Sequence, residues 1–550
     1  MSKLTQLNVS IRGMTCNGCA RNIDRALTNK QGINNKTVSY PDGKAEISYD
    51  SDVITKEELI ETINNIGHYK VTGEIESSEN DGNRFDLLII GGGSAAFAAA
   101  IRTSELGGRS AIINRGLPTG GTCVNVGCVP SKTLIRTAEM IHHANHPRFE
   151  GIESKAAITD FKTIIDQKRQ MVNDLREGKY VDVIADDPNI KLVEGFGRFV
   201  DEHTVEVDGT AYNGTNILIA TGAAPWAPPI EGLEETGYLT NESAYELNSL
   251  PDSLVVFGGG YIALENAQLF SRLGSKVTII QRSGRILSDQ SEELGTELAG
   301  YLEDEGISVL TNTQIKEVSK NEASSKKVVR LTVDGKEQQL EANDILVATG
   351  RIGNTANLGL ENVGIETIGR GYIPVDETLR TAKDHIFAAG DVLGERQFVY
   401  TAAYEGKICA QNAMRGSRGK VDFSALPWVI FTDPQVAGVG MDEQQAKETG
   451  IDFEVSKLSL AHVPRAIAAR DTRGFIKLIR SKANDRLVGA RILAPEGSEL
   501  LMELTLAIRH NIPVESLKSE FHPYLTLSEG IKLAAITFGK DVGKLSCCAT

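Results

Sequence analysis

The chain has 550 residues, more than one hydrophobic core usually supports, so we expect several domains. Its 41% hydrophobic and 24% charged residues are typical of a globular protein. A net charge of −15 offers no basic surface for nucleic acid, and no apolar run reaches the ~18 residues of a membrane span. We therefore expect no nucleic-acid partner and no membrane insertion. Because the N-terminal residues lack a secretory pattern, we expect a cytoplasmic protein.

Residues 1–73 are patterned as a small α/β unit. Alternating polar and apolar residues predict strands at 7–11, 36–40 and 45–49, with one helix after Gly18 and another from Thr55. Residues 74–84 are polar and contain glycine, which predicts a flexible linker between this unit and the rest of the chain.

Two glycine loops, each between a buried strand and a helix, predict two dinucleotide-binding units of the Rossmann type. Glycines let the backbone approach a pyrophosphate, and the following helix N-terminus supplies amide donors. The bland alternative is an ordinary tight strand-to-helix turn. The two loops are Gly91-Gly-Gly93-Ser-Ala-Ala96 and Gly258-Gly-Gly260-Tyr-Ile-Ala263.

The strand after each glycine loop indicates how a ribose would be held. Asn114 ends the first of these strands, where a carboxylate normally accepts the ribose hydroxyls, so we expect a weaker contact there. The second strand is followed by Arg282 and Arg285 and by no acidic residue. Guanidinium groups pair with a 2′-phosphate, which favours NADPH over NADH; the alternative is that both arginines are solvated surface charges.

Six of the seven cysteines form close pairs, which in a reducing compartment are more often catalytic or metal-binding than structural. A helix predicted at residues 131–140 follows the central pair, and its N-terminus would lower a thiolate pKa. The pair near the chain end is interpreted as mobile soft ligands, with a degenerate tail as the alternative. Cys409 is interpreted as a small buried hydrophobe. The pairs are Cys16/Cys19, Cys123/Cys128 and Cys547/Cys548.

The segment Gly120-Gly-Thr-Cys123-Val-Asn-Val-Gly-Cys128-Val-Pro-Ser-Lys132 resembles the redox centre of the pyridine nucleotide-disulfide oxidoreductases. The likeness covers residues 85–545 and includes the motifs Ala220-Thr-Gly222, Ala348-Thr-Gly-Arg351 and Phe387-Ala-Ala-Gly-Asp391-Val. It implies an α/β fold with an FAD-binding domain at 85–245 and 351–424, an NADPH-binding domain at 246–350 and an α+β dimerisation domain at 425–550. FAD contacts would include Thr122, Lys132, Gly222 and Asp391, and the protein would be a homodimer.

The same resemblance assigns roles around the central cysteines. Reducing equivalents would pass from NADPH through FAD to a Cys123–Cys128 disulfide, with Cys128 nearer the flavin and Cys123 facing the substrate. Lys132 and Glu265 would form a charge pair near flavin and nicotinamide, for which a surface salt bridge is the alternative. Tyr261 would lie over the flavin as a gate for the nicotinamide.

Features near both ends favour the branch of the family that reduces mercuric ion. Disulfide-reducing members have a histidine five residues before a glutamate, but five residues before Glu529 this chain has Tyr524, and His522 is two residues out of register. Metal binding to thiolates needs no such proton shuttle, and Tyr524 would place a hydroxyl near the metal. Gly13-Met-Thr-Cys16-Asn-Gly-Cys19 resembles the metal-binding loop of heavy-metal-associated domains, which implies a ferredoxin-like βαββαβ fold for residues 1–73.

These resemblances imply that the substrate is Hg(II) carried by small thiols. The ion would pass by ligand exchange from Cys16/Cys19 to Cys547/Cys548 and then to the inner pair, with composite sites in the homodimer. One alternative is another flavin disulfide reductase, similar to lipoamide dehydrogenase. A second is a thiol-based protein that sequesters heavy metal, and copper delivery remains an alternative for the N-terminal unit alone.

Overall fold

A computed structural model describes residues 4–28, 30–40, 43–74, 81–541 and 543. They form two compact units, one ending at Arg84 and the other beginning at Phe85. Within the described ranges, no helix is both long and apolar enough to cross a membrane.

The N-terminal unit has the predicted βαββαβ order, with two helices on one antiparallel four-stranded sheet of order β2-β3-β1-β4. Its core is made by the alternating apolar residues of the strands and the apolar faces of the helices, including Val9, Ile23 and Ile47, which are fully buried. The elements are β1 (Leu4–Arg12), α1 (Asn17–Thr28), β2 (Ile33–Ser39), β3 (Lys44–Asp50), α2 (Lys56–Asn64) and β4 (Lys70–Glu74).

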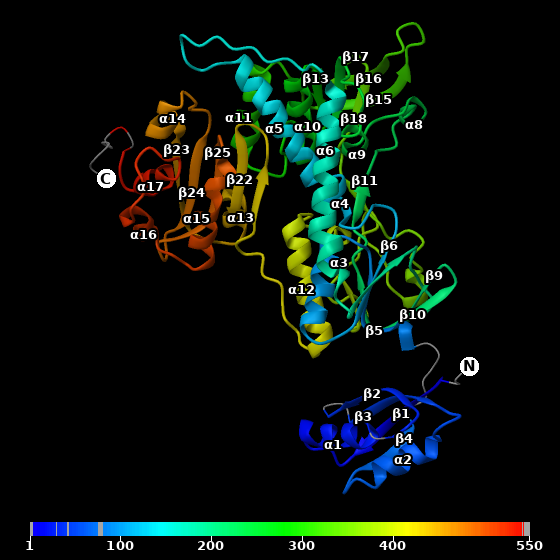
Figure 1. Ribbon diagram of the computed structural model, residues 1–550. Helices are drawn as coiled ribbons and strands as arrows, with labels where there is room; N and C mark the ends of the chain where they lie inside the picture. The colour runs from blue at the N-terminus through cyan, green and yellow to red at the C-terminus, as the bar shows by residue number, and fades with distance from the viewer. Residues whose placement is uncertain (1–3, 29, 41–42, 75–80, 542, 544–550) are drawn as a thin grey trace. The chain divides into compact units, whose positions relative to one another are not determined.

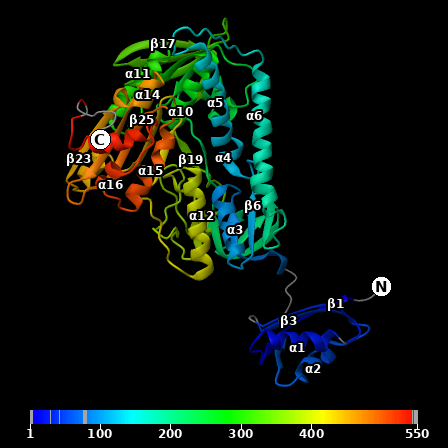
Figure 2. The same ribbon diagram turned by 60° about the vertical axis from the view of Figure 1, so that its left-hand side comes forward.

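The larger unit begins with a seven-stranded sheet whose strands β7, β6, β5, β10 and β20 run parallel. Helices α3 and α12 lie side by side against it (Figures 1 and 2). They approach closely because Gly406 of α12 faces the backbone of Ala95, where a side chain would overlap the Ala95 carbonyl. The strands are β5 (Arg84–Ile90), β6 (Ser110–Asn114), β7 (Ile190–Glu194), β8 (Arg198–Phe199), β9 (Thr204–Val207), β10 (Thr210–Ile219) and β20 (Ile386–Ala388).

The helices of this first domain are α3 (Ser94–Glu105), α4 (Gly121–Asn125), α5 (Cys128–Asn145), α6 (Phe161–Arg176), α7 (Asp182–Ala185) and α12 (Val399–Arg415), with a π-helical turn, η2, at Glu177–Val181. Helix α5 is longer than the 131–140 helix predicted from the sequence. It starts at Cys128 itself because Pro130 is tolerated in a first helical turn, where its missing N–H has no partner to lose.

The second domain has a parallel sheet of order β14-β13-β12-β18 and an antiparallel three-stranded sheet of order β15-β16-β17. Its elements are β12 (Ser253–Phe257), α10 (Tyr261–Leu273), β13 (Lys276–Ile280), α11 (Glu292–Asp304), β14 (Ser308–Leu310), β15 (Thr313–Lys320), β16 (Lys327–Val333), β17 (Lys336–Ala342) and β18 (Asp344–Val347). A two-stranded ladder of β11 (Ala223–Pro225) and β19 (Arg351–Gly353) joins it to the first domain.

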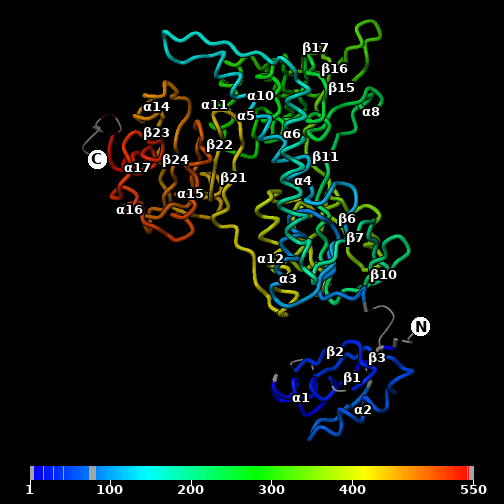
Figure 3. The backbone as a smooth tube through the Cα atoms, in the orientation of Figure 1, coloured from blue at the N-terminus to red at the C-terminus, as the bar shows by residue number. Residues whose placement is uncertain are grey.

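The third domain is an antiparallel five-stranded sheet of order β21-β22-β25-β24-β23 covered by helices. The backbone leaves α12 and reaches β21 through residues 416–426, which can be followed in Figure 3. The elements are β21 (Pro427–Ile430), β22 (Gln435–Gly440), α13 (Glu443–Glu448), β23 (Phe453–Ser459), α14 (Pro464–Ala468), β24 (Phe475–Ser481), β25 (Arg486–Ala494), α15 (Gly497–Arg509), α16 (Val514–Ser519) and α17 (Glu529–Ile536).

The structure assigns both end residues of the predicted linker, 74–84, to strands. Strand β4 includes Glu74, a 3₁₀ turn occupies Asp81–Asn83, and β5 already begins at Arg84. Residues 75–80 lie outside the described residues. Strand β4 pairs with β1 in the N-terminal unit, and β5 pairs with β6 in the larger unit. The exact domain boundaries inferred from the sequence stay a prediction.

Removing residues 1–80 should leave the larger unit folded, because each unit has a hydrophobic core of its own. We expect the unfolding midpoint of the shortened protein to lie within about 2 °C of the corresponding transition in the full chain. Differential scanning calorimetry on both forms measures this. An unfolded or aggregated product would show that the boundary is wrong.

Candidate active site

One cavity of about 480 Å³ gathers residues from all three domains of the larger unit. Its walls come from the first glycine loop, the segment around the central cysteines, the start of α10, the turn before Asp391, the start of α12 and the end of β21. The predicted site residues that line it are Gly93, Thr122, Cys123, Cys128, Lys132, Gly222, Tyr261, Glu265 and Asp391.

Cys123 in α4 and Cys128 at the start of α5 both face this cavity, and both thiols are free. A hydrogen bond with Cys123 lowers the pKa of Cys128 to about 7; burial opposes this shift, and the Lys132 ammonium supports it. The same hydrogen bond, together with burial, raises the pKa of Cys123. Near neutral pH the pair therefore offers a thiolate at Cys128 and a thiol at Cys123.

Lys132 and Glu265 form a close ion pair that is not on the surface. The Lys132 Nζ lies 2.7 Å from Glu265 Oε2, and the Glu265 side chain is only 8% exposed. The other oxygen, Oε1, accepts a 2.9 Å hydrogen bond from the Phe431 amide. Because both carboxylate oxygens have partners, the buried charge is compensated, and the surface-salt-bridge alternative does not describe this pair.

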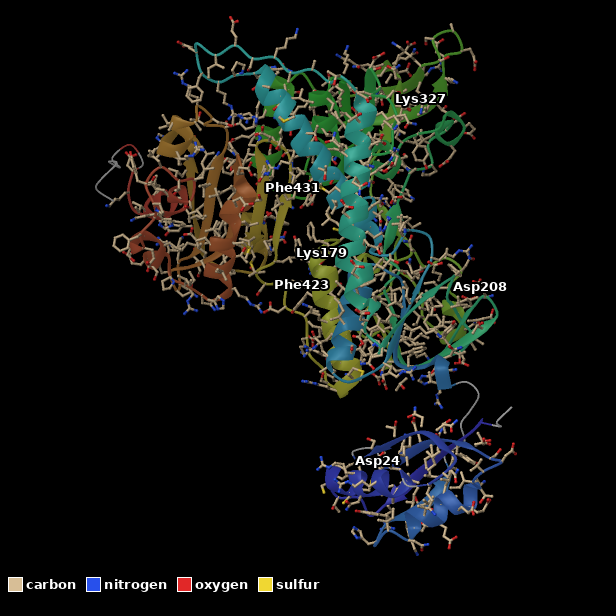
Figure 4. The ribbon with its side chains drawn as sticks, viewed as in Figure 1. Asp24, Lys179, Asp208, Lys327, Phe423 and Phe431 are labelled. Carbon is tan, nitrogen blue, oxygen red and sulfur yellow. The ribbon has the colours of Figure 1, made fainter. Side chains whose placement is uncertain are left out.

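Tyr261 is the first residue of α10 and stands in an aromatic cluster beside the cavity. Its ring stacks on Trp428 and Phe398 at centroid distances of 5.7 and 6.4 Å. Phe431, labelled in Figure 4, lies under the Lys132 ammonium at 4.7 Å. The Tyr261 ring, which directly follows the second glycine loop, therefore lines the same cavity as the cysteine pair.

The wall around Asp391 suits the flavin that the resemblance implies. Burial raises the pKa of Asp391, and Arg351, whose Nε lies 3.7 Å from its carboxylate, lowers it. The Arg351 Nε and the Thr221 hydroxyl are buried without a hydrogen-bond partner among the described residues. Buried polar groups normally have partners, and Arg351 lines the cavity, so its unused Nε fits a site that a bound molecule would complete.

The glycine loops have the shapes expected of phosphate-binding turns. Gly91 and Gly258 have φ angles of 120° and 118°, and a side chain at either would overlap a carbonyl, of Ala220 and Ala348 respectively. Gly93 and Gly260 each stand just before the helix as its N-cap. Helix N-terminal amides therefore point to where a pyrophosphate would lie.

Other predicted cofactor residues lie away from the cavity. Ala96 is buried inside α3. Asn114 ends β6 beside Gly92, and its amide donates to the Leu117 carbonyl at 3.1 Å, which leaves its oxygen for a ribose. Arg282 is exposed, whereas the half-buried Arg285 donates from Nη2 to the carbonyls of Ser288 and Gln290.

Tyr524 and Glu529 lie in the third domain and do not line the cavity of their own chain. Tyr524 is 54% exposed, and Glu529 begins α17 and accepts from the Leu525 amide at 3.3 Å. His522 is held by Glu503 at 2.9 Å. Cys547 and Cys548 lie outside the described residues.

The N-terminal unit brings Cys16 and Cys19 together, with their sulfurs 3.8 Å apart. Cys16 is exposed, and Cys19 is covered by Tyr69 and Thr15. A hydrogen bond from the Tyr69 hydroxyl, with further bonds from Thr15, lowers the pKa of Cys19 to about 6. This site pairs an accessible sulfur with a thiolate, which suits a soft metal ion.

Two residues near the thiol pairs were not identified from the sequence. Tyr180 contacts Ser94 through its hydroxyl at 3.2 Å and stands close enough to Cys123 and Cys128 for their charges to raise its pKa, after the larger effect of burial. It lies in the π-helical turn η2, which no periodicity marks. Tyr69 was likewise hidden, because it follows a turn far from Cys19 along the chain.

Comparison with known proteins agrees with this arrangement. Residues 85–406 match the pyridine nucleotide-disulphide oxidoreductase family, residues 426–535 its dimerisation domain and residues 8–69 the heavy-metal-associated domain. The chain belongs to the pyridine nucleotide-disulphide oxidoreductases. The matches confirm the fold class predicted from the sequence. Membership of this family also implies the use of a flavin and NAD(P)H.

Several relatives match this family member along its whole length. The mercuric reductase of Staphylococcus aureus is 41% identical over 98% of both chains, and that of Lysinibacillus sphaericus is 42% identical over 99% of this chain and 100% of its own. Among solved structures, the Cu(II) complex of the HOCl-induced flavoprotein disulfide reductase RclA from Escherichia coli is similar at a TM-score of 0.74. It is 32% identical and covers 83% of this chain and 100% of its own.

The Cys128 thiolate gives a prediction about pH. Its pKa of about 7 means that the thiolate is present above this pH and is lost as the pH falls through it. Cys123→Ala removes the main stabilising hydrogen bond, and Lys132→Met removes a favourable charge, so each should move the midpoint upward. Thiolate absorbance of the reduced protein against pH measures the midpoint, and an unmoved value in Cys123→Ala would contradict the assignment.

Proposed function

We propose that this flavoprotein is an NADPH-dependent mercury(II) reductase that converts thiol-bound Hg(II) to elemental mercury. The observation that carries the proposal is the cysteine pair at the three-domain cavity, in a chain that resembles mercuric reductases over its full length. The heavy-metal-associated unit and its close Cys16/Cys19 pair support a soft metal ion as substrate.

The cavity residues have complementary parts in this reaction. FAD, when bound, would carry electron pairs from the nicotinamide to the cysteine pair. The Cys128 thiolate would be one ligand of Hg(II), and the Cys123 thiol, which the resemblance places on the substrate side, would lose its proton as it becomes the other. Hg(II) held by both sulfurs takes up two electrons and leaves as Hg(0), which returns the two thiolates.

The Lys132–Glu265 pair places a fixed positive charge beside Cys128. The ammonium favours the thiolate more strongly than the Glu265 carboxylate disfavours it, and the carboxylate and the Phe431 ring hold the ammonium in place. This arrangement favours the ionised form of Cys128, so that less of it must release a proton before it binds the metal. Tyr180, whose hydroxyl contacts Ser94, would stand behind the cysteine pair, near both sulfurs but outside the cavity lining.

NADPH is proposed as the reductant because Arg282 is an exposed cation where the second sheet's strand β13 ends. The homodimer is proposed because residues 426–535 match a dimerisation domain. Tyr524 and Glu529 are exposed or partly exposed there, away from the chain's own cavity, and would serve the cavity of the partner subunit. The cytoplasmic location also stays a proposal.

The first test is mercury-dependent oxidation of NADPH in the presence of excess small thiol. Cys123→Ala and Cys128→Ala should each lower turnover by at least about a thousandfold while the bound flavin remains, because two sulfurs must hold the ion together. Cys409→Ala is a matched control, since Cys409 is fully buried outside the cavity. Near-normal turnover in either cavity variant would reject the mechanism.

The same assay separates the alternative activities. Reduction of lipoamide or glutathione disulfide at a rate similar to that of Hg(II) would favour a disulfide reductase. Stoichiometric metal binding without NADPH oxidation would favour sequestration.

A second test concerns the C-terminal cysteines, which we propose deliver Hg(II) to the cavity of the partner subunit. Heterodimers of Cys123→Ala/Cys128→Ala and Cys547→Ala/Cys548→Ala subunits contain one complete site only if transfer crosses the interface. We expect about half of the wild-type mercury turnover per dimer, measured after isolating the heterodimer by two affinity tags. Activity equal to that of the parent homodimers would indicate transfer within one subunit.

A further inference from the structure

The loop between β13 and α11, residues 281–291, reaches from the expected 2′-phosphate end of the nucleotide site to Tyr261. Arg282 stands exposed at its start. Near its end, the Gln290 Nε2 donates a hydrogen bond to the Tyr261 hydroxyl at 3.4 Å. One continuous loop therefore connects the two ends of the nucleotide site.

Arg285 determines the shape of the second half of this loop. Its Nη2 donates to the Ser288 carbonyl at 3.0 Å and to the Gln290 carbonyl at 2.9 Å. The guanidinium thus bridges two backbone acceptors and fixes the position of Gln290. Both protons of Nη2 are used inside the loop, and Nε is buried without a hydrogen-bond partner among the described residues. Only Nη1 is then left, so no pair of neighbouring guanidinium nitrogens is free to bind a phosphate bidentately.

The backbone at Leu287 shows that this shape is held by several contacts. Leu287 has a φ of 48°, the left-handed region that a branched side chain rarely occupies. Its side chain is buried, its amide donates to the Gly259 carbonyl at 2.9 Å, and its carbonyl accepts from the Gln290 amide at 2.9 Å. The loop is thereby fastened to the second glycine loop as well as to Gln290.

The bond between Gln290 and Tyr261 is at the long end of hydrogen-bond distances. Tyr261 is otherwise held by stacking on Trp428 and Phe398, contacts that allow a ring to slide. A weak directional bond added to such contacts keeps the ring in one place, yet a ligand can break it. Such a bond can hold a movable side chain in one position until a ligand displaces it.

We propose that Arg285 and Gln290 form a latch that holds Tyr261 beside the cavity, and that Arg285 positions this gate instead of binding the 2′-phosphate. The inference rests on the proposed function, since it takes Tyr261 to lie on the path of the nicotinamide. It also reassigns Arg285, which the sequence grouped with Arg282 as a phosphate ligand. Arg282 alone then contacts the 2′-phosphate.

Calorimetric titration of the holoenzyme with two ligands tests this division. Adenosine 2′,5′-bisphosphate carries the 2′-phosphate without a nicotinamide, and NADP⁺ carries both. Arg282→Gln should weaken both ligands by about tenfold or more, because each loses a phosphate contact. Arg285→Gln should leave the bisphosphate unchanged and tighten NADP⁺ by about two- to tenfold, because the nicotinamide no longer breaks the latch.

A double-mutant cycle identifies the latch itself. Gln290→Ala and Tyr261→Phe each remove one side of the bond and should each tighten NADP⁺ by the same factor as Arg285→Gln. The double variant Gln290→Ala/Tyr261→Phe should show no further gain. Ser288→Ala is the matched control, because only its backbone carbonyl takes part, and it should bind both ligands like the wild type.

Equal weakening of the bisphosphate by Arg285→Gln and Arg282→Gln would overturn the proposal, as would additive effects in the double variant. The Gln290 variants keep the test valid if Arg285→Gln does not fold. Because the titrations use no mercury, a failure of the latch is distinct from a failure of the proposed function, which appears as absent mercury-dependent NADPH oxidation. Absence of NADP⁺ binding to the unmutated holoenzyme would overturn both.

Discussion

The cavity depends on the two interactions of the Glu265 carboxylate, because together they join all three domains of the larger unit. The carboxylate projects from α10, binds the Lys132 ammonium from α5 and accepts the Phe431 amide from the third domain. A buried carboxylate that lost either partner would be uncompensated, at a cost of about 3–5 kcal/mol. The cysteine helix, the nucleotide-domain helix and the third domain therefore adopt one mutual arrangement, and the cavity lies where they meet.

The same face of α10 repeats this contact further along the helix. Gln268 accepts from the Asp433 amide at 2.7 Å and donates to its carbonyl at 2.9 Å, and Arg272 reaches the Asp433 carboxylate at 2.9 Å. Glu265, Gln268 and Arg272 are three and four residues apart and so share one helix face. The third domain is thus registered against the helix that begins with Tyr261. The position of the third domain is therefore fixed relative to Tyr261 and, through Lys132, to the cysteine helix α5.

The sequence predicted what local pattern determines and missed what folding brings together. The glycine loops, the spacing of the central cysteines and the first five elements of the N-terminal unit follow from short-range pattern, and the structure contains them. The last strand of that unit, at Lys70–Glu74, was implied only by the resemblance. Arg285 was grouped with Arg282 because composition cannot show that its guanidinium closes on its own loop. Tyr180 and Phe431 were missed because their nearness to the cysteines and to Lys132 arises from long-range packing. Asp391 was found only through resemblance, since a single Asp after glycine has no distinctive spacing.

The two described thiol sites solve the same chemical problem in different ways. At each site one cysteine has a lowered pKa, about 6 at Cys19 and about 7 at Cys128, but Cys19 depends first on the Tyr69 hydroxyl and Cys128 on its partner thiol. A neutral donor such as Tyr69 stays in place when metal arrives. In the proposed transfer the Cys123 thiol would give up its proton as it becomes the second ligand, and Cys16, 3.8 Å from the Cys19 sulfur, would supply the second sulfur of the N-terminal site. Both sites would hold a soft cation between two sulfurs, so reduction at the inner site, which removes the ion, would favour transfer inward.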